Sequence, residues 1–253
     1  MKTLILGGTT EARLLAGELK ARGDMDVVLS LAGRTANPIA QGVATRIGGF
    51  GGAEGLANYL RAENISRLID ATHPYAAQIS ENAHRAAQRT GTPFIALRRP
   101  PWMQHPDDRW VFAPTVQDAV AALGSEPVRA FLTLGRNDIR PFESAPQHAY
   151  LIRSVDPIDP PLAVPDATYL TARGPFQSRD ELALLKRHRI GAVVSKNSGG
   201  DASYGKIAAA RALKIPVVMI ERPRLPDAPS VWSIPEVLSW CDHALTASTR
   251  RGV

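Results

Sequence analysis

The feature that most constrains the fold is the regular alternation of short apolar runs with helical patterns. In the first half the apolar runs, rich in Val, Ile and Leu, are Thr3–Leu6, Val27–Leu31, Leu68–Ala71 and Phe94–Leu97. Between them, apolar residues recur at helical spacing in Thr10–Arg22, Ala53–Glu63 and Tyr75–Arg89. Strands without polar alternation are typical of parallel sheets covered on both faces. The pattern therefore predicts a doubly wound α/β fold.

A second series of the same kind follows. Its predicted strands are Ala130–Leu134, Ala149–Ile152, Tyr169–Thr171, Ala192–Ser195 and Val217–Ile220, and its predicted helices are Arg179–His188, Ser203–Leu213 and Pro235–Ala244. The proline-rich stretches 98–114 and 156–165 predict irregular segments. We therefore predict two Rossmann-like parallel-sheet domains with a cleft between them. The expected boundaries are 1–98 and 129–245 for the domains, 99–128 for a connection and 246–253 for a flexible tail.

Length and composition exclude several classes of protein. The 253 residues suit one large or two small domains. One cysteine, Cys241, rules out an intrachain disulfide, and the six histidines show no metal-ligand spacing, so we expect no metal site. No apolar run approaches the ~18 residues of a membrane span, and the N-terminal run is too short for a signal peptide. We expect a cytoplasmic protein that does not bind membranes.

The positive charge is carried almost entirely by arginine. Of the 30 basic residues, against 24 acidic ones, only six are lysines. A genome that favours Arg codons explains this excess, and so does a site for a polyanion, because arginine grips carboxylates and phosphates in pairs of hydrogen bonds. The basic residues are dispersed and aromatic residues make up 6%, which argues against nucleic acid as a partner.

A glycine turn follows the first predicted strand and leads into a helix. Gly8, Thr9, Thr10 and Glu11 occupy this turn, where helix N–H groups could receive a nucleotide phosphate. The turn lacks the third glycine of the G-x-G-x-x-G pattern, so a structural turn remains an alternative, and the threonine hydroxyls would then cap the helix. We predict cofactor binding by these four residues.

Two further segments of the first half are predicted to contact the cofactor. No carboxylate stands at the end of the second strand, where an acid would favour NAD; Arg34 stands there instead and favours the extra phosphate of NADP, unless it is an ordinary loop arginine. The run Gly48–Gly52, including Gly49, either closes over a flat ligand or supplies positive-φ turns.

Polar residues also follow the third predicted strand. The run from Asp70 includes Thr72, His73, Pro74 and Tyr75, at the strand edge where open α/β sheets bind ligands. We predict that Thr72 and His73 bind the cofactor. His73 and Tyr75 are the candidate catalytic proton donors, with bound water as a rival. Pro74 is expected in the first turn of the next helix.

In the second half, cations and glycines follow three predicted strands. The candidate substrate-binding residues are Arg136, Arg173, Lys196, Ser198, Gly199 and Lys206. Gly200-x4-Gly205-Lys206 imitates a phosphate-binding loop, but Ile207 replaces the hydroxyl that would hold Mg²⁺, so triphosphate hydrolysis is excluded. The Tyr-x-x-x-Lys pair of short-chain dehydrogenases and the Gly-x-Ser-x-Gly elbow are also absent from the sequence.

Taken together, these motifs resemble the precorrin-6A reductase family of cobalamin biosynthesis. The matching stretches run in order along both halves: LILGGTTEAR at 4–13, GGFGG at 48–52, DATHPYA at 70–76, LTLGRND at 132–138, ARGPF at 172–176 and SKNSGGDASYGKIAAARALKIPVVMIERP at 195–223. The resemblance implies an NADPH-dependent oxidoreductase that transfers a hydride to a double bond of precorrin-6A, giving precorrin-6B, without flavin or metal.

The resemblance also gives the predicted residues their ligands. NADPH would lie on the glycine turn and Arg34, while a tetrapyrrole with acetate and propionate arms would account for the cations of the second half. It implies a small-molecule partner and transient contact with other enzymes of the pathway. The alternatives are a cobalt-precorrin-6A reductase of the anaerobic branch, suggested by Asn197, and a non-catalytic nucleotide-binding protein.

Overall fold

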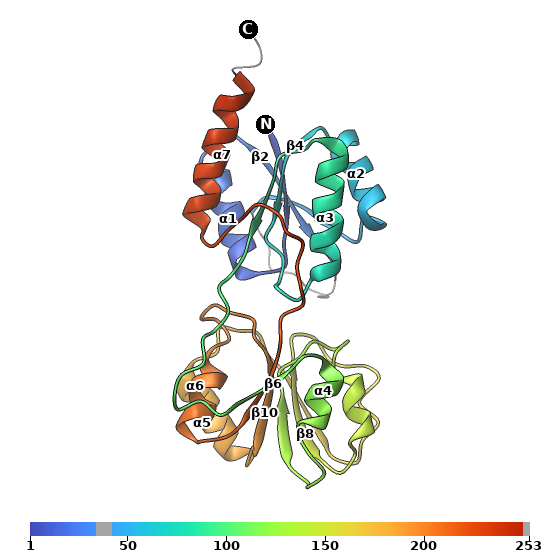
Figure 1. Cartoon of the computed structure of the whole chain (residues 1–253), viewed down its shortest axis with the longest axis vertical. Coiled ribbons are helices and arrows are strands. Elements are labelled where there is room, and N and C mark those ends of the chain that lie inside the picture. Colours follow the sequence, from blue (N-terminus) through green and yellow to red (C-terminus); the bar gives the residue numbers. More distant parts are fainter. Residues whose placement is uncertain (34–41, 250–253) are drawn as a thin grey trace. The chain divides into compact units, whose positions relative to one another are not determined.

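The computed structural model describes residues 1–33 and 42–249 and divides into two compact units. The first unit comprises Met1–Arg99 with Pro223–Val253, and the second comprises Pro100–Arg222. Each unit is built on a six-stranded sheet whose strands pair in parallel throughout (Figure 1). The predicted fold class, two Rossmann-like parallel-sheet domains of the α/β class, is confirmed in its sheets and flanking helices.

The first sheet has the strand order β3-β2-β1-β4-β5-β12. Its strands are β1 (Lys2–Leu6), β2 (Asp26–Leu31), β3 (Ala44–Ile47), β4 (Ile65–Asp70), β5 (Phe94–Leu97) and β12 (Ser230–Val231). Its helices are α1 (Thr10–Ala21), α2 (Gly52–Ala62), α3 (Ala77–Thr90) and α7 (Ile234–Thr249). Helices α1 and α7 cover one face, and α2 and α3 cover the other (Figure 1).

Alternating side chains of the central strands build a core on each face of this sheet. Leu4 of β1 packs with Leu56 of α2 and belongs to the core beneath α2 and α3. Its neighbour Ile5 packs with Leu15 of α1 and Val237 of α7 on the opposite face. Because successive side chains of a strand point to opposite faces, a continuous apolar run such as β1 serves both cores.

The second sheet has the order β9-β8-β7-β10-β11-β6. Its strands are β6 (Trp110–Ala113), β7 (Arg129–Leu132), β8 (Ala149–Ser154), β9 (Ala167–Thr171), β10 (Ala192–Lys196) and β11 (Val217–Ile220). Its helices are α4 (Val116–Ala121), the 3-10 helix η1 (Arg140–Ser144), α5 (Ser178–Arg187) and α6 (Gly205–Ala212). Helices α5 and α6 lie on one face and α4 on the other (Figure 1).

The two units exchange their outermost strands. β6 follows β5 in the chain but joins the second sheet, and β12 follows β11 but joins the first. The predicted boundaries therefore differ from the structural division: 99–128 contains β6 and α4, and the helix near 235–245 belongs to the first unit. The boundaries were drawn on the expectation that consecutive elements are neighbours. β6 and β12, with four and two residues, are too short to show a sequence periodicity that contradicts this expectation.

Three further differences concern single elements. β3 was not predicted, because its edge position leaves most of Ala44–Ile47 exposed and removes the apolar signal. α3 begins at Ala77 rather than Tyr75, since Pro74 lies in a turn closed by the Ala76 N–H donating to the His73 carbonyl at 2.8 Å. α7 continues to Thr249, so the expected tail is helical up to that residue.

Candidate functional site

The glycine turn between β1 and α1 is open on its outer side. Gly8 has φ +110°, and a Cβ added there would meet no atom within 4 Å. On the inner side, a Cβ at Gly7 would lie 2.6 Å from Cδ1 of Leu29, so a side chain there would have to displace Leu29. In this sheet order the turn lies where β1 and β4 are neighbours and the connections diverge, the usual ligand-binding point of the fold.

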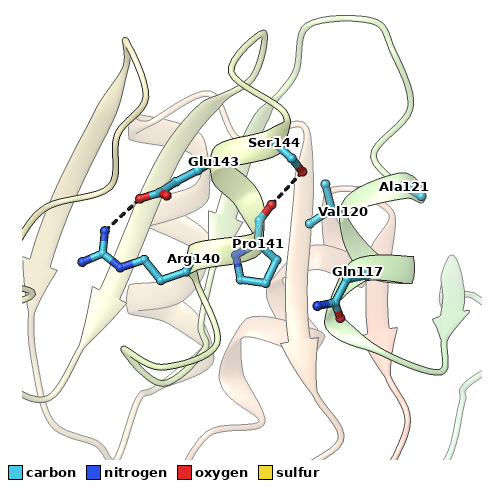
Figure 2. Close-up of a pocket in the computed structure, with 7 residues that line it drawn as sticks. All are labelled: Gln117, Val120, Ala121, Arg140, Pro141, Glu143 and Ser144. Carbon is cyan, nitrogen blue, oxygen red and sulfur yellow. Dashed lines mark hydrogen bonds and ion pairs between the residues drawn. The ribbon is translucent and has the colours of Figure 1, made fainter.

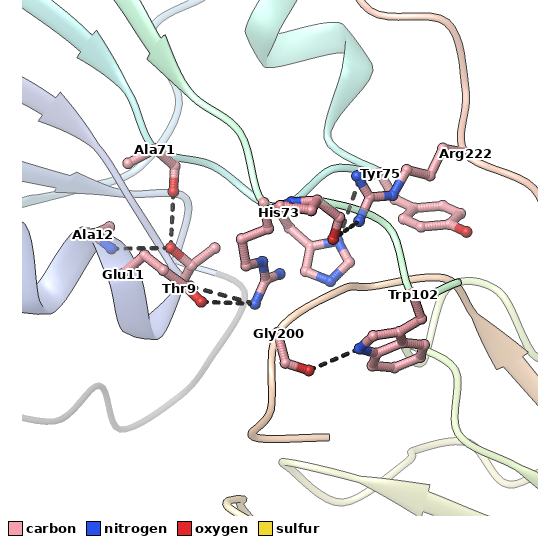
Figure 3. Close-up of polar contacts among 11 residues, drawn as sticks. Thr9, Glu11, Ala12, Ala71, His73, Tyr75, Trp102, Gly200 and Arg222 are labelled. Atoms are coloured by element: carbon pink, nitrogen blue, oxygen red, sulfur yellow. Dashed lines mark hydrogen bonds and ion pairs between the residues drawn. The ribbon is translucent and has the colours of Figure 1, made fainter. Parts of the chain in front are cut away.

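The two threonines of the turn differ in their roles. The Thr9 hydroxyl accepts from the Ala12 N–H at 3.1 Å and donates to the Ala71 carbonyl at 2.9 Å (Figure 3). It is thus the helix cap and ties α1 to the end of β4, as the structural alternative predicted. Thr10 is exposed in the first turn of α1, where helix N–H groups have no intrahelical acceptor.

Glu11 forms an ion pair with an arginine of the same unit. Its Oε2 lies 3.3 Å from Nη1 of Arg99. A carboxylate in the first turn of a helix is favoured by the helix dipole. The residue therefore adds negative charge to the turn, and Arg99, which sequence reasoning did not single out, compensates it.

The glycine-rich segment 48–52 is shaped by an arginine that was also missed. Arg46 donates from Nη1 to the Gly48 carbonyl at 2.5 Å and from Nη2 to the Gly49 carbonyl at 2.7 Å. Its guanidinium lies 3.8 Å from the centre of the Phe50 ring. Gly48, Gly51 and Gly52 have positive φ, so the positive-φ role is confirmed. Gly49 is exposed. Arg34 lies outside the described residues.

A buried polar network follows β4. Asp70 is fully buried and lies 2.9 Å from Nη2 of Arg98 on its Oδ2 side. Its Oδ1 accepts from the Thr72 hydroxyl at 2.6 Å and the Thr72 N–H at 3.1 Å. Ser80 of α3 lies 3.3 Å from Arg98 and completes the network. The Thr72 hydroxyl therefore helps to hold the loop, and its contact with a cofactor stays a prediction.

The two candidate proton donors lie side by side in the same loop. The Tyr75 N–H donates to Nδ1 of His73 at 3.3 Å, and the two rings lie 5.6 Å apart between centres. Both side chains are half-buried. With Nδ1 as acceptor, the proton of the neutral imidazole resides on Nε2. The ring is thus held in one tautomer by its own loop.

In the second unit, two of the predicted substrate-binding cations have acidic neighbours. Lys196, at the end of β10, donates to Oδ2 of Asp138 at 2.7 Å. Arg173 lies 3.8 Å from Oδ1 of Asp156. Arg136 is exposed in the loop after β7. All three cations lie at or just beyond the carboxyl ends of strands of one parallel sheet, so they share its carboxyl edge.

Lys206 is at odds with its predicted role in substrate contact. It is 3% exposed, and its Nζ donates to the Ser203 carbonyl at 2.7 Å. Burial, with a smaller contribution from the charge of Arg153, lowers its pKa from 10.5 to about 7, while Glu181 acts in the opposite sense. The lysine lies on α6 and packs inward, so its ammonium supports the protein and is not presented at the surface.

Ser198 and Gly199 lie in a loop held by Trp102, which sequence reasoning overlooked, and by Asn197. Trp102 donates from its indole N–H to the Gly200 carbonyl at 2.8 Å (Figure 3). Asn197 bonds the Trp102 backbone twice, accepting from its N–H and donating to its carbonyl. The tryptophan stands in the proline-rich segment predicted to be irregular, and nothing in its local sequence relates it to a loop 95 residues away.

Two other features bear on function. A surface pocket between α4 and η1 is lined by Gln117, Val120, Ala121, Arg140, Pro141, Glu143 and Ser144 (Figure 2). Its charged groups bond one another, Arg140 to Glu143 at 2.8 Å. Within residues 1–33 and 42–249, no group of three His, Cys, Asp or Glu side chains could hold a metal ion, and no helix is long and apolar enough to cross a membrane.

The two parallel sheets and the glycine turn define a two-unit Rossmann-like protein of the α/β class. A sequence model of the family described as precorrin-6x reductase CbiJ/CobK matches residues 2–242. The chain belongs to this family.

Comparison with individual proteins agrees with that assignment. A precorrin-6A reductase from Sinorhizobium sp is 56% identical over 96% of this chain and 94% of its own length. A solved structure of a CobK precorrin-6A reductase matches with a TM-score of 0.92 and 46% identity, covering 96% of this chain and 97% of that one. A cobalt-precorrin-6A reductase from Methanothermobacter thermautotrophicus is 30% identical over 89% of this chain.

Proposed function

We propose that this protein reduces precorrin-6A to precorrin-6B with NADPH, as a step of cobalamin biosynthesis. The observation that carries the proposal is the open glycine turn at the head of α1, in a chain 56% identical to a protein named for this reaction. The alternative substrate, the cobalt-containing intermediate, has a relative of only 30% identity.

The residues around the turn fit a dinucleotide. The space beside Gly8 is open, because a Cβ added there would meet no atom within 4 Å. The first-turn N–H groups of Thr10 and Glu11 lack intrahelical acceptors. We assign the pyrophosphate to these groups, with Gly49 on the neighbouring loop as a further contact. When bound, the nicotinamide supplies a hydride, so the protein's task is to orient the two rings and exclude water.

The preference for NADPH rests on the end of β2. Residues 31–33 contain no carboxylate to bond a ribose 2′-hydroxyl, and Arg34 follows them as the proposed partner of the 2′-phosphate. Changing Arg34 to Glu is expected to weaken NADPH use far more than NADH use, because it replaces an attraction by a repulsion. Unchanged kinetics with NADPH in this variant would refute the placement.

Reduction of a double bond also needs a proton on the second atom. We assign this proton to Nε2 of His73, because the Tyr75 N–H donates to Nδ1. A proton from water would replace the one that Nε2 gives up, so that the imidazole ends the step neutral. Tyr75 would then position the imidazole. The acidic arms of the tetrapyrrole are assigned to Arg136, Arg173, Lys196, Ser198 and Gly199. Lys196 and Arg173 would exchange Asp138 and Asp156 for substrate carboxylates.

The decisive experiment measures NADPH oxidation by the purified protein with and without precorrin-6A. The proposal expects one NADPH consumed per precorrin-6A, and none in its absence. Binding of NADPH without oxidation would establish the non-catalytic alternative. Faster reduction of the cobalt-loaded substrate than of the metal-free one would instead assign the chain to the anaerobic branch.

A matched pair of glycine variants tests the cofactor site. Gly8→Ala and Gly124→Ala both force alanine to a positive φ where a Cβ meets no atom within 4 Å. Only Gly8 belongs to the proposed cradle, so only Gly8→Ala should weaken NADPH binding measured by calorimetry. Equal affinities in the two variants would remove Gly8 from the site.

A cytoplasmic location and transient contacts with other enzymes of the pathway stay predictions.

A further inference from the structure

The loop between β10 and α6, residues 197–204, is fixed by bonds to its own carbonyl groups. Four successive carbonyls each accept a hydrogen bond from a different donor. Gly200 accepts from Trp102, Asp201 from Tyr204, Ala202 from Phe176 and Ser203 from Lys206. The last of these is the only bond in the set made by an ammonium group. Such a charge-assisted bond is about twice as strong as a neutral one.

The first part of the 197–204 loop is packed too closely to move by itself. A Cβ at Gly199 would lie 2.2 Å from the Pro100 carbonyl oxygen and 2.7 Å from Nη2 of Arg222. Arg222 also donates from Nε to the Asn197 carbonyl at 2.8 Å. These contacts hold residues 197–200, so the remaining freedom of the loop lies nearer α6, where Ser203 is held by Lys206.

Lys206 is enclosed on every side by elements of the second unit. Its Nζ lies 4.9 Å from the centre of the Trp102 ring, over the ring face. Arg153 of β8 and Glu181 of α5 are the charged groups that face it. These two residues are themselves bonded twice, at 2.5 and 2.8 Å. The Arg153 guanidinium also lies 3.6 Å from the centre of the Phe176 ring.

The cluster therefore joins two of the loops assigned to the substrate. Phe176 ends the Arg173–Phe176 segment, and its N–H donates to Ala202 in the 197–204 loop at 2.9 Å. A Cβ at Gly205 would lie 2.4 Å from the Phe176 carbonyl oxygen. A shift of Ser203 would consequently be transmitted to both segments.

We propose that Lys206 is a positioning residue for tetrapyrrole binding, whose buried ammonium, bonded to Ser203 and resting on Trp102, holds the two substrate loops in their receptive shape. This inference rests on the proposed function for the identity of the ligand, but not for the holding of the loops. It replaces the direct contact expected for Lys206 from sequence.

The first test compares Lys206→Met with Lys186→Met, a control that removes an exposed lysine from α5. Because a charge-assisted bond is lost, the KM for precorrin-6A should rise about fivefold to tenfold in Lys206→Met. The kcat should change much less, and the Kd of NADPH should not change. Lys186→Met should keep the wild-type KM. A wild-type KM in Lys206→Met would overturn the proposal.

The pH profile separates positioning from mere structural support. The wild-type KM should rise as the pH passes through about 7, where Lys206 loses its charge. The KM of Lys206→Met should stay level over the same range, so that the two curves converge at higher pH. Parallel curves would overturn the proposal, even if the variant binds substrate weakly.

The second test needs no substrate. Amide hydrogen exchange in residues 198–204 should be faster in Lys206→Met than in Lys186→Met, while exchange in β7 should be the same in both. Unchanged exchange in the loop would overturn the proposal whatever the activity. If the wild-type protein fails to reduce precorrin-6A, the proposed function falls, and the exchange result still decides whether Lys206 holds the loops.

Discussion

Single residues show how the same polar side chain can serve a ligand or the fold. Asp70 and Thr72 stand at the strand edge where ligands bind, yet their oxygens are bonded to each other, and Asp70 is ion-paired with Arg98. Thr9, in the proposed phosphate turn, is likewise a helix cap. The backbone N–H groups beside these side chains are therefore better candidates for ligand contact than the side chains themselves.

Removing the charge of Asp70 is expected to lower the stability of the protein strongly, because Asp70 is ion-paired with Arg98. Asp70→Asn would leave the Arg98 guanidinium, only 10% exposed, without a counter-charge. Breaking a buried pair in this way costs about 3–5 kcal/mol, which urea unfolding would measure. Glu54→Gln is the matched control: its pair with Arg89 is about half exposed and is worth at most about 1 kcal/mol. Equal losses in the two variants would contradict the interpretation.

The lowered pKa of Lys206 leads us to expect that the difference in stability between the wild type and Lys206→Met depends on pH. Its pKa is lowered from 10.5 to about 7 in the folded protein, so between these values the unfolded chain binds one more proton. The free energy of unfolding of the wild type should then rise with pH relative to Lys206→Met, by about 1.4 kcal/mol per pH unit. Below about 7 the difference should stop changing. Urea titrations at several pH values would check this, and a constant difference would contradict it.

At the scale of elements, the glycines of two helices differ in the space around them: Gly55 is crowded and Gly17 is not. In α2, a Cβ at Gly55 would lie 1.7 Å from the Phe50 carbonyl oxygen, because the helix packs directly on the glycine-rich segment. In α1, a Cβ at Gly17 would meet no atom within 4 Å, and its φ is not positive. The helical pattern of the sequence does not distinguish the two glycines. The difference in the space around them comes from packing in the folded protein.

A pair of alanine substitutions tests this contrast. Gly55→Ala must displace the 48–52 segment and should destabilise the protein by about 1–3 kcal/mol, with weaker NADPH binding if Gly49 contacts the cofactor. Gly17→Ala should stabilise it by about 0.5–1 kcal/mol, since alanine is the better helix former. Thermal unfolding and calorimetry would measure both effects. Destabilisation by Gly17→Ala would show that the space around α1 is not open.

At the scale of the whole molecule, the exchanged strands make one unit continuous in sequence and the other discontinuous. The second unit is one continuous segment, Pro100–Arg222, with all six of its strands. The first depends on the returning chain for β12 and α7, whose Val237 and Cys241 are fully buried in its core. Without this return, the apolar surface of that core would face water.

Fragments should therefore differ in their ability to fold. A fragment of residues 100–222 should unfold cooperatively in denaturant, monitored by circular dichroism. A fragment of residues 1–99 should not, because it lacks the strand and helix that cover Ile95 and Leu97. Adding residues 223–249 through a flexible linker to the shorter fragment should restore cooperative unfolding. A cooperative transition of 1–99 alone would contradict the dependence.

The sequence by itself determined the class of fold, most strands and helices, the family and the stretches at the strand edges. These follow from local periodicity, which records burial on both faces of a strand, and from short motifs such as Gly7–Glu11. Only the tertiary structure decided which sheet β6 and β12 join, and that Lys206 faces inward while Trp102 holds a distant loop. The strand pairings and the Trp102 contacts join residues 95 or more positions apart, and Lys206 faces Arg153 of β8 and Glu181 of α5. No local pattern encodes such contacts.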